Sequence, residues 1–296
     1  MTRPTDWQLD PDIAERITAT WQAAGRGQVS PITRFAPSPT GGLHLGHLEH
    51  MRWLWATAGL LDLDVIIRME DHDRTRCTPA LEDQILDDIA WLGFVPESRS
   101  LDSLRGAPPS AYRQSDHPER YQAAFERLEA MDLLYGCSCT RGDLPPPDAD
   151  GERHYPGTCR GKPIDREGRT AVRVMLPDEP VEFTDLFLGT IAQHPARDHG
   201  DPVIRDALGQ WTYQFCVVVD DMHDDIGVII RGEDLLSSTG RQWLLAKLLG
   251  REAPTVTLHH PLVLGDDGRK LSKRNGSTAI GAPRSRLNDE GSRMKD

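Results

Sequence analysis

Two histidines, His44 and His47, lie three residues apart in the stretch TRFAPSPTGGLHLGH at residues 33–47. A glycine-rich turn between a strand and a helix exposes backbone N–H groups and the positive end of the helix dipole, and both attract phosphate. At helical spacing the two imidazoles lie on neighbouring parts of one face, where they could donate to phosphate oxygens. Metal binding with His50 as a third ligand, or simple solvation of the histidines, are the alternatives.

A second candidate for phosphate chemistry is the sequence KLSKR at residues 270–274, which lies between glycines. The side chains of Lys270, Ser272 and Lys273 could close over a polyphosphate and neutralise a leaving pyrophosphate. A basic run by itself is more often solvated surface. Its pairing with an upstream His-x-Gly-His sequence favours a nucleoside triphosphate site.

Three of the five cysteines, Cys137, Cys139 and Cys159, lie close together in a loop-rich segment. An odd number of cysteines, clustered in this way, argues against a disulfide framework. Three thiolates and a fourth donor bind Zn²⁺ tetrahedrally, and a metal would hold together a proline-rich loop that has little apolar content. Unmetallated surface cysteines are the alternative.

The composition excludes some classes of protein. The chain has 296 residues and a net charge of −12, which argues against indiscriminate binding to nucleic acid or to an anionic membrane. No apolar run approaches the ~18–20 residues that span a bilayer, and the first residues do not read as a signal peptide. We therefore expect a cytoplasmic protein.

The candidate residues lie in an alternation of strands and helices. Short β-branched runs at 31–36 and 64–71 are typical of buried parallel strands, and apolar residues at helical spacing predict helices at 48–61 and 79–93. This pattern predicts an α/β fold with a Rossmann-like parallel sheet. We divide the chain into an N-terminal extension at 1–30, the first half of a catalytic domain at 31–136, an inserted subdomain at 137–200, the second half of the catalytic domain at 201–280 and a disordered tail at 281–296.

Five motifs in order carry a resemblance to a known family. The stretch RFAPSPTGGLHLGH resembles the first adenylate-forming signature of class I aminoacyl-tRNA synthetases in its glutamyl form, and KLSKR resembles the second. The sequences RMED, YQFCVVVDD and VIIRGEDLL resemble the glutamyl branch of the same family. The resemblance covers residues 31–280. It implies that ATP, with Mg²⁺, activates L-glutamate to glutamyl-AMP.

The resemblance also implies site residues. The implied catalytic residues are His44, His47 and Lys273. The implied glutamate-binding residues are Arg34, Phe35, Ala36, Pro37, Ser38, Glu70, Tyr213 and Arg231. The implied ATP-binding residues are His44, Gly46, His47, Lys270, Ser272 and Lys273. The implied zinc ligands of the inserted subdomain are Cys137, Cys139, Tyr155 and Cys159.

Two of these assignments stay open at the level of sequence. Arginine binds carboxylates bidentately, and Arg34 and Arg231 both lie at predicted strand ends, so the sequence does not decide which of them takes the side-chain carboxylate of glutamate. Glu70 is the expected partner of its ammonium group. Imidazole is a commoner zinc ligand than phenol, so His154 competes with Tyr155 for the fourth position.

The length of the chain bears on which molecule accepts the activated glutamate. A glutamyl-tRNA synthetase continues into a helical anticodon-binding part after its second signature, whereas this chain ends about two dozen residues after KLSKR. We expect no anticodon-binding domain, and a resemblance to the truncated glutamyl-queuosine aspartate-tRNA synthetases. These attach glutamate to the base queuosine in the anticodon of tRNA(Asp), although members of that group often vary the last position of HLGH.

The expected partners are therefore ATP, L-glutamate and tRNA(Asp) carrying queuosine, with one structural Zn²⁺, no membrane and a monomeric protein. Three other functions stay open. The chain could charge a tRNA 3′ end as a truncated glutamyl-tRNA synthetase, or bind RNA without catalysis. It could also be a small nucleotidyltransferase, although that function leaves the two arginines and the cysteine cluster unexplained.

Overall fold

The fold is taken from a computed structural model of the chain, which describes residues 6–24, 27–96, 100–147, 151–165, 167, 170–252, 255–262 and 280. The expected signature at 270–274, with Lys270, Ser272 and Lys273, lies outside the described residues, as does the expected disordered tail at 281–296.

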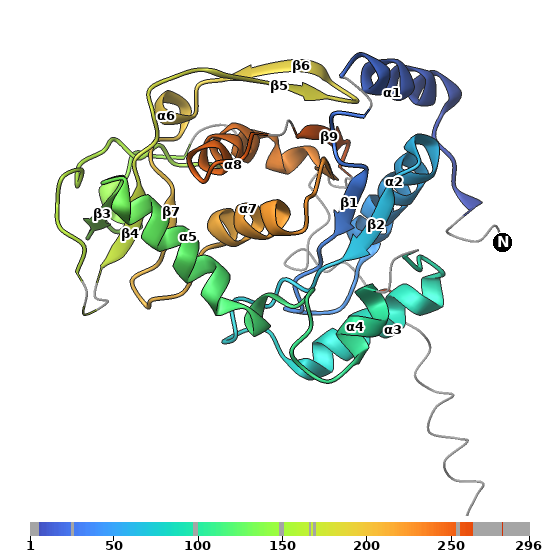
Figure 1. Cartoon of the computed structure of the whole chain (residues 1–296), viewed down its shortest axis with the longest axis horizontal. Helices are drawn as coiled ribbons and strands as arrows, with labels where there is room; N and C mark the ends of the chain where they lie inside the picture. Colours follow the sequence, from blue (N-terminus) through green and yellow to red (C-terminus); the bar gives the residue numbers. More distant parts are fainter. Residues whose placement is uncertain are drawn as a thin grey trace, which may run out of the picture.

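A largely parallel sheet forms the centre of the molecule (Figure 1). Its strands are β1 (Ile32–Phe35), β2 (Asp64–Ile67), β5 (Val181–Asp185), β8 (Val228–Gly232) and β9 (Val256–His260). Strand β1 pairs with β2, and β9 pairs with both β8 and β5, all in parallel. The backbone N–H of Gly227 donates to the carbonyl of Ile32 at 3.1 Å, so β8 begins beside β1. The predicted α/β fold with a parallel sheet is confirmed.

Helices connect these strands, and their ends follow from local sequence. The principal ones are α1 (Pro11–Ala23), α2 (Leu45–Leu61), α3 (Pro79–Leu92), α5 (Pro118–Ala130), α7 (Tyr213–His223) and α8 (Leu236–Leu248). The hydroxyl of Thr78 accepts from the backbone N–H of Leu81 at the start of α3, and Gly93 ends that helix with a φ of 82°. Threonine at the N-cap and glycine in the left-handed region stabilise helix ends, as the sequence predicts for this segment.

A second, antiparallel sheet is separate from the central one. It consists of β3 (Leu134–Cys137), β4 (Ala171–Val174) and β7 (Val203–Arg205), with β4 in the middle. Short α4 (Ser100–Arg105) follows α3, and α6 (Pro195–Asp198) precedes β7. The cysteine-bearing loop follows β3, so the three-stranded sheet holds the base of that loop.

The expected segments at 137–200 and 201–280 do not correspond to the two sheets, because strands of each segment join the sheet expected for the other. Strand β5 and its antiparallel partner β6 (Gly189–Gln193), which we expected in the insertion, join the central sheet through β9. Strand β7, which we expected in the second half of the catalytic domain, pairs with β4. The buried carboxylate of Asp185 fixes β5 to β9, because it accepts from the hydroxyl of Thr257 and from the backbone N–H of His259.

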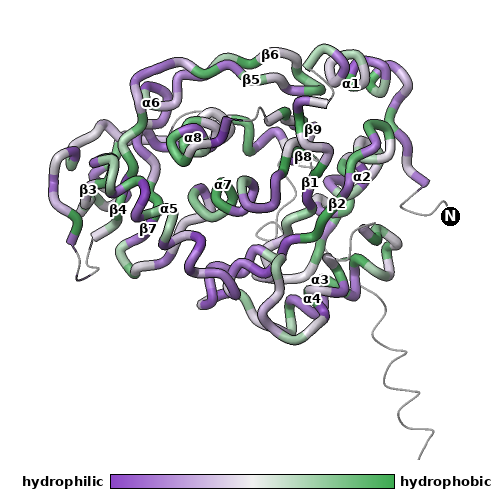
Figure 2. Tube along the Cα trace, viewed as in Figure 1, coloured by the Kyte–Doolittle hydropathy of each residue, from purple (hydrophilic) through white to green (hydrophobic). Residues whose placement is uncertain are grey.

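Helix α1 belongs to the main core. Its Ile17 and Trp21 are buried, and Arg16 lies over the ring of Phe187 at 4.5 Å, in the turn between β5 and β6. Trp7 contacts Trp53 of α2 with ring centroids 5.7 Å apart. The N-terminal extension therefore packs against the helix that carries the two signature histidines. Figure 2 shows the hydrophobic stretches of the central strands that make up this core.

No helix in the described part of the chain is long and apolar enough to cross a membrane.

Candidate active site

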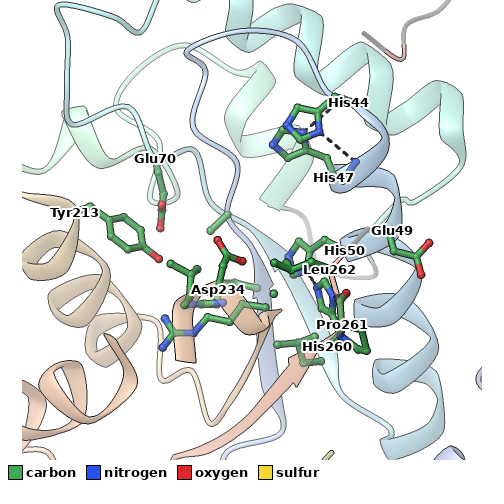
Figure 3. Close-up of a pocket in the computed structure, with 17 residues that line it drawn as sticks. His44, His47, Glu49, His50, Glu70, Tyr213, Asp234, His260, Pro261 and Leu262 are labelled. Carbon is green, nitrogen blue, oxygen red and sulfur yellow. Dashed lines mark hydrogen bonds between the residues drawn. The ribbon is translucent and has the colours of Figure 1, made fainter. Parts of the chain in front are cut away.

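A pocket of about 370 Å³ opens at the carboxyl ends of the central strands, where ligands bind in open parallel sheets. It is lined by Arg34, Ala36, His44, Gly46, His47, Glu49, His50, Glu70, Tyr213, Ile230, Arg231, Gly232, Asp234, Leu235, His260, Pro261 and Leu262. Figure 3 shows Glu70 and Tyr213 on one side of it, His50, His260, Pro261 and Leu262 on the other, and His44 and His47 above His50, near the start of α2.

The two signature histidines cap α2 reciprocally. The Nδ1 atom of His44 accepts from the backbone N–H of Gly46, and the Nδ1 atom of His47 accepts from the backbone N–H of His44, both at 3.1 Å. A ring nitrogen that accepts carries no proton, so each neutral ring carries its proton on Nε2. The cap therefore makes Nε2–H of both rings a donor, at the helix end that favours anions.

A buried network of charges holds Arg34. Its Nε and Nη2 atoms donate to both oxygens of Asp221, at 2.9 and 3.1 Å. Arg68 donates to the same Asp221 at 2.8 Å, to Glu70 at 3.3 Å and to Asp224 at 3.0 Å. The bidentate pair fixes the plane of the Arg34 guanidinium at the pocket wall.

Glu70 is a buried carboxyl group that is suited to a cation. Burial raises the pKa of Glu70 above its usual value, although Arg68 and Arg34 act in the opposite direction. A carboxyl group with a raised pKa gains most from a new positive charge beside it. An ammonium group bound in the pocket would stabilise the ionised form of Glu70.

Arg231 lacks the carboxylate partner that Arg34 has. Its Nη1 and Nη2 atoms donate to Gln242 and Thr239, each at 2.7 Å, and its Nε atom donates to His259 at 3.2 Å. Burial lowers the pKa of Arg231, while the neighbouring Tyr213 raises it. Among the described residues no carboxylate forms an ion pair with Arg231, so a bound carboxylate would supply the missing counter-charge.

The pocket brings together most, but not all, of the described residues that the sequence analysis assigns to substrates. Its lining includes Arg34, Ala36, Glu70, Tyr213 and Arg231 of the implied glutamate set, and all three described members of the ATP set, His44, Gly46 and His47. The other three are not among the lining residues. Phe35 is buried against His50 and Trp55, while Pro37 and Ser38 lie in the following turn.

The structure also shows what the sequence analysis missed. The alternative in which His50 joins His44 and His47 at a metal is not supported, because the described residues group no histidines in that way and His50 bonds to His260 instead. Asp221, Arg68 and the pair His259–His260 had no assigned part in the site. A signal existed for Asp221, since two acids follow an apolar run in CVVVDD, where a charge is buried only with a partner.

The cysteine cluster is compact. The Sγ atoms of Cys137, Cys139 and Cys159 lie within 4.8 Å of one another. The hydroxyl of Tyr155 lies 3.6 Å from Sγ of Cys137 and accepts from the backbone N–H of Cys159 at 2.8 Å. Three sulfurs at this separation suit the tetrahedral geometry of Zn²⁺, whose bonds to sulfur are about 2.3 Å long. Among the described residues His154 is not part of the cluster.

Cations surround these sulfurs. Lys162 donates to Sγ of Cys159, and Nε of Arg173 donates to Sγ of Cys137, both at 3.3 Å. Burial by itself would raise the pKa of Cys159, but hydrogen bonds from the backbone of Ser138 and from neighbouring side chains lower it to about 6. Donors of this kind stabilise thiolates, which are the form that binds a metal.

Comparison with known proteins bears on the family of the chain. A family model described as tRNA synthetases class I (E and Q), catalytic domain, matches residues 31–289. A protein of Geobacter sulfurreducens named Glutamyl-Q tRNA(Asp) synthetase is 42% identical over 259 residues, which are 86% of this chain and 78% of the relative. A protein of the same name from Ralstonia nicotianae is 40% identical over 285 residues, covering 92% of this chain and 84% of the relative.

Two solved structures are similar over a shorter part of their own length. A glutamate tRNA ligase from Elizabethkingia meningosepticum, solved with its amino acid, has a TM-score of 0.64 and 29% identity, and a glutamate-tRNA synthetase from Elizabethkingia anophelis has a TM-score of 0.65 and 29% identity. The match covers 83% of this chain in both cases, and 52% and 53% of those chains, so this chain spans about half their length. From the family match and the similarity to its named members, the chain belongs to the class I tRNA synthetases of the E and Q family and is a ligase.

Proposed function

We propose that the protein activates L-glutamate with ATP to form glutamyl-AMP, and transfers the glutamyl group to queuosine in the anticodon of tRNA(Asp). One observation carries the first half of this proposal. The pocket combines Arg231, a buried cation without a carboxylate partner, with Glu70, a buried carboxyl group whose pKa is raised. A small molecule with an ammonium group and two carboxylates complements both.

In this proposal glutamate lies between these two groups. Its ammonium group binds Glu70, and its side-chain carboxylate binds Arg231, which Tyr213 and Thr239 hold in place. Arg34 faces the same part of the pocket, while its Nε and Nη2 atoms are bound to Asp221. The α-carboxylate then points toward His44 and His47.

Activation is a displacement at phosphorus. An oxygen of the α-carboxylate bonds to the α-phosphorus of ATP, and the bond from that phosphorus to the bridging oxygen of pyrophosphate breaks. The Nε2–H donors of His44 and His47 would stabilise the charge that develops on the phosphate oxygens. Mg²⁺ would supply further neutralisation of the phosphate charge, and Lys270, Ser272 and Lys273 are proposed to hold the leaving pyrophosphate.

The cysteine cluster is proposed as a structural zinc site. Cys137, Cys139 and Cys159 would supply three thiolates and Tyr155 the fourth ligand. The closeness of the three sulfurs and the position of the Tyr155 hydroxyl support this set over one with His154. The metal would hold the loop after β3 in a single conformation.

The acceptor is proposed from the relatives. Those that share about 40% identity over most of the chain are named for glutamyl-Q tRNA(Asp). The two similar solved structures from Elizabethkingia are glutamate-tRNA ligases, which favours charging of a tRNA 3′ end as the second candidate.

Two assays test the proposal separately. We expect glutamate-dependent exchange of labelled pyrophosphate into ATP without tRNA, and an absence of exchange at high enzyme concentration would overturn glutamate activation. We also expect labelled glutamate to transfer to tRNA(Asp) that carries queuosine, and not to the same tRNA without it. Transfer to the 3′ end of tRNA(Glu) would support the second candidate instead.

A further inference from the structure

Two consecutive histidines, His259 and His260, end strand β9 at the floor of the pocket. Successive side chains of a strand point to opposite faces, so these two rings contact different neighbours. His259 is fully buried behind Arg231, whereas His260 lines the pocket beside His50. The strand therefore places one imidazole against Arg231 and the other in the lining of the pocket, where Figure 3 shows His260 beside His50.

His259 links Arg231 to the central sheet. A guanidinium group only donates, so the Nε2 atom of His259, 3.2 Å from Nε of Arg231, is an acceptor without a proton. The ring proton is then on Nδ1 and is donated to Oδ2 of Asp185 at 2.7 Å. That carboxylate is fully buried and also accepts from Thr257 and from the backbone of β9. Arg231 is thus fixed through His259 to two strands.

His260 holds His50 by the same reasoning. The Nδ1 atom of His260 lies 2.9 Å from the carbonyl oxygen of Pro261, which only accepts, so Nδ1 carries the proton. The Nε2 atom of neutral His260 then accepts from Nδ1 of His50 at 3.1 Å. The two rings are stacked with centroids 5.3 Å apart, and Trp53 stacks on His260 with centroids 5.8 Å apart.

This arrangement leaves Nε2 of His50 as an acceptor, with no hydrogen-bond partner in the described part of the chain. An acceptor suits a hydrogen-bond donor on a ligand and repels phosphate oxygens. His50 lies one turn beyond His47 on α2, below His44 and His47 in Figure 3 and across the pocket from Glu70 and Tyr213. The part of ATP that carries donors, and that extends away from the reacting phosphate, is its nucleoside.

We propose that His259 and His260 are positioning residues for the two substrates, His259 holding Arg231 for glutamate and His260 holding His50 for the nucleoside of ATP. The glutamate half rests on the proposed function of Arg231. The nucleoside group concerned is a donor to His50, either the exocyclic amine of the base or a ribose hydroxyl.

Both rings act in this way only when they are neutral. A proton on Nε2 of His259 would face the N–H of Arg231, and a proton on Nε2 of His260 would remove the acceptor that holds His50. Burial lowers the pKa of His259, although Asp185 raises it, and Arg231 and His260 lower it further. Burial also lowers the pKa of His260, against the carbonyl of Pro261 and the carboxylates Glu49, Asp234 and Glu233.

Two matched variants, His259→Leu and His260→Leu, test the proposal in the pyrophosphate exchange assay. We expect His259→Leu to raise KM for glutamate by about tenfold, as the loss of one hydrogen bond to a charged group does, with KM for ATP within about twofold. We expect the reverse for His260→Leu. His259→Gln should restore most of the KM for glutamate, because its amide can donate to Asp185 and accept from Arg231.

ATP analogues then identify the group that His50 binds. If His50 binds the exocyclic amine, the wild-type protein should use inosine triphosphate less well than ATP, and this difference should disappear in His50→Ala. If His50 binds a ribose hydroxyl, the wild-type protein should use 2′- or 3′-deoxy-ATP less well than ATP, and that difference should disappear in His50→Ala. An unchanged preference against all of these analogues in His50→Ala would overturn the nucleoside half of the proposal.

Other results would overturn the proposal as a whole. Equal rises in both KM values in both leucine variants would indicate general damage, and a His259→Gln protein no better than His259→Leu would contradict the hydrogen-bond chain. Nitrogen NMR of the wild-type imidazoles needs no variant to fold, and should show protons on Nδ1 of His259 and His260. If the wild-type protein exchanges normally but neither leucine variant selectively raises the KM of its own substrate, only the positioning roles are overturned. If the wild-type protein shows no exchange, the proposed function and the assignment of Arg231 are overturned.

Discussion

Arg68 is almost fully buried and donates to three carboxylates, those of Asp221, Glu70 and Asp224. Glu70 lines the pocket, and Asp221 holds Arg34 at the pocket wall. Removing one member of a buried ion network costs far more than the network contributes over an apolar core, because the remaining charges stay buried without a partner. At the scale of single residues, Arg68 therefore controls both the stability of the protein and the position of Arg34 and Glu70.

We expect Arg68→Met to lower the free energy of unfolding by about 3–5 kcal/mol, since it leaves three acids clustered without their shared cation. Urea denaturation at pH 7 measures this. The matched control is Arg197→Met, which removes an exposed arginine paired with Asp178 and should change stability little. Equal effects of the two substitutions would contradict the role of burial.

At the scale of elements, the loop after β3 depends on a few contacts. Three cysteines, one tyrosine and the neighbouring Lys162 and Arg173 bring together parts of the chain that are separated by more than twenty residues. Little apolar surface is available to the loop itself, which contains the run of prolines at 145–147. A bound metal would reinforce the small core of this element, in which Tyr135 and Tyr155 are buried beside the cysteines.

We expect the purified protein to contain about one zinc ion per chain, and Cys139→Ala to lose it, as measured by elemental analysis. Tyr155→Phe should weaken zinc binding by about tenfold or more, whereas His154→Ala should leave it unchanged. Cys77→Ala is the matched control, because Cys77 is buried away from the cluster. Loss of zinc in His154→Ala with retention in Tyr155→Phe would reverse the proposed ligand set.

The N-terminal helix is a second case at this scale. The sequence analysis assigned no role to residues 1–30. In the structure α1 packs on α2 with Trp21 buried, Arg16 lies over Phe187 in the β5–β6 turn, and Trp7 contacts Trp53. Trp53 in turn stacks on His260. The extension is thus connected by ring contacts to the histidines of the pocket.

At the scale of the whole molecule, three histidines make the stability of the fold depend on pH: His259 and His260, which are buried, and His50, which is half-buried. Burial lowers the pKa of His50, His259 and His260 below the usual value of 6.5. Below pH 6.5 the unfolded chain binds protons that the folded chain does not, so protonation favours unfolding. Glu70 and Asp224, whose pKa values are raised, act in the opposite direction at lower pH, nearer to the ordinary range of carboxyl groups.

We expect the free energy of unfolding to fall as the pH is lowered from 7 to 5.5, by up to about 1.4 kcal/mol per pH unit for each proton taken up. Urea denaturation at several pH values measures the slope. His50→Gln should reduce the slope, because one of the three groups is gone. A flat profile over this range in the wild-type protein would show that the buried rings are not neutral.

Much of the fold follows from local sequence. The strand at 64–67 and the helix that Thr78 caps and Gly93 ends were predictable, because β-branched runs, N-caps and left-handed glycines act over a few residues. The choice of sheet for a given strand was not. Strands β5 and β7 have similar local patterns, and only the hydrogen bonds to β9 and β4 distinguish the sheets that they join.

The sequence by itself determined the family of the protein and singled out the residues that we propose to carry its chemistry. The spacing of His44 and His47, the two arginines at strand ends and the three cysteines are properties of the chain, and family membership follows from their order. Only the tertiary structure decided what holds them. Asp221 reaches Arg34 across 187 residues and Asp185 reaches His259 across 74. The reason is physical: a buried charge or a fixed tautomer needs a partner at hydrogen-bond distance, and the position of that partner is set by how the strands pack.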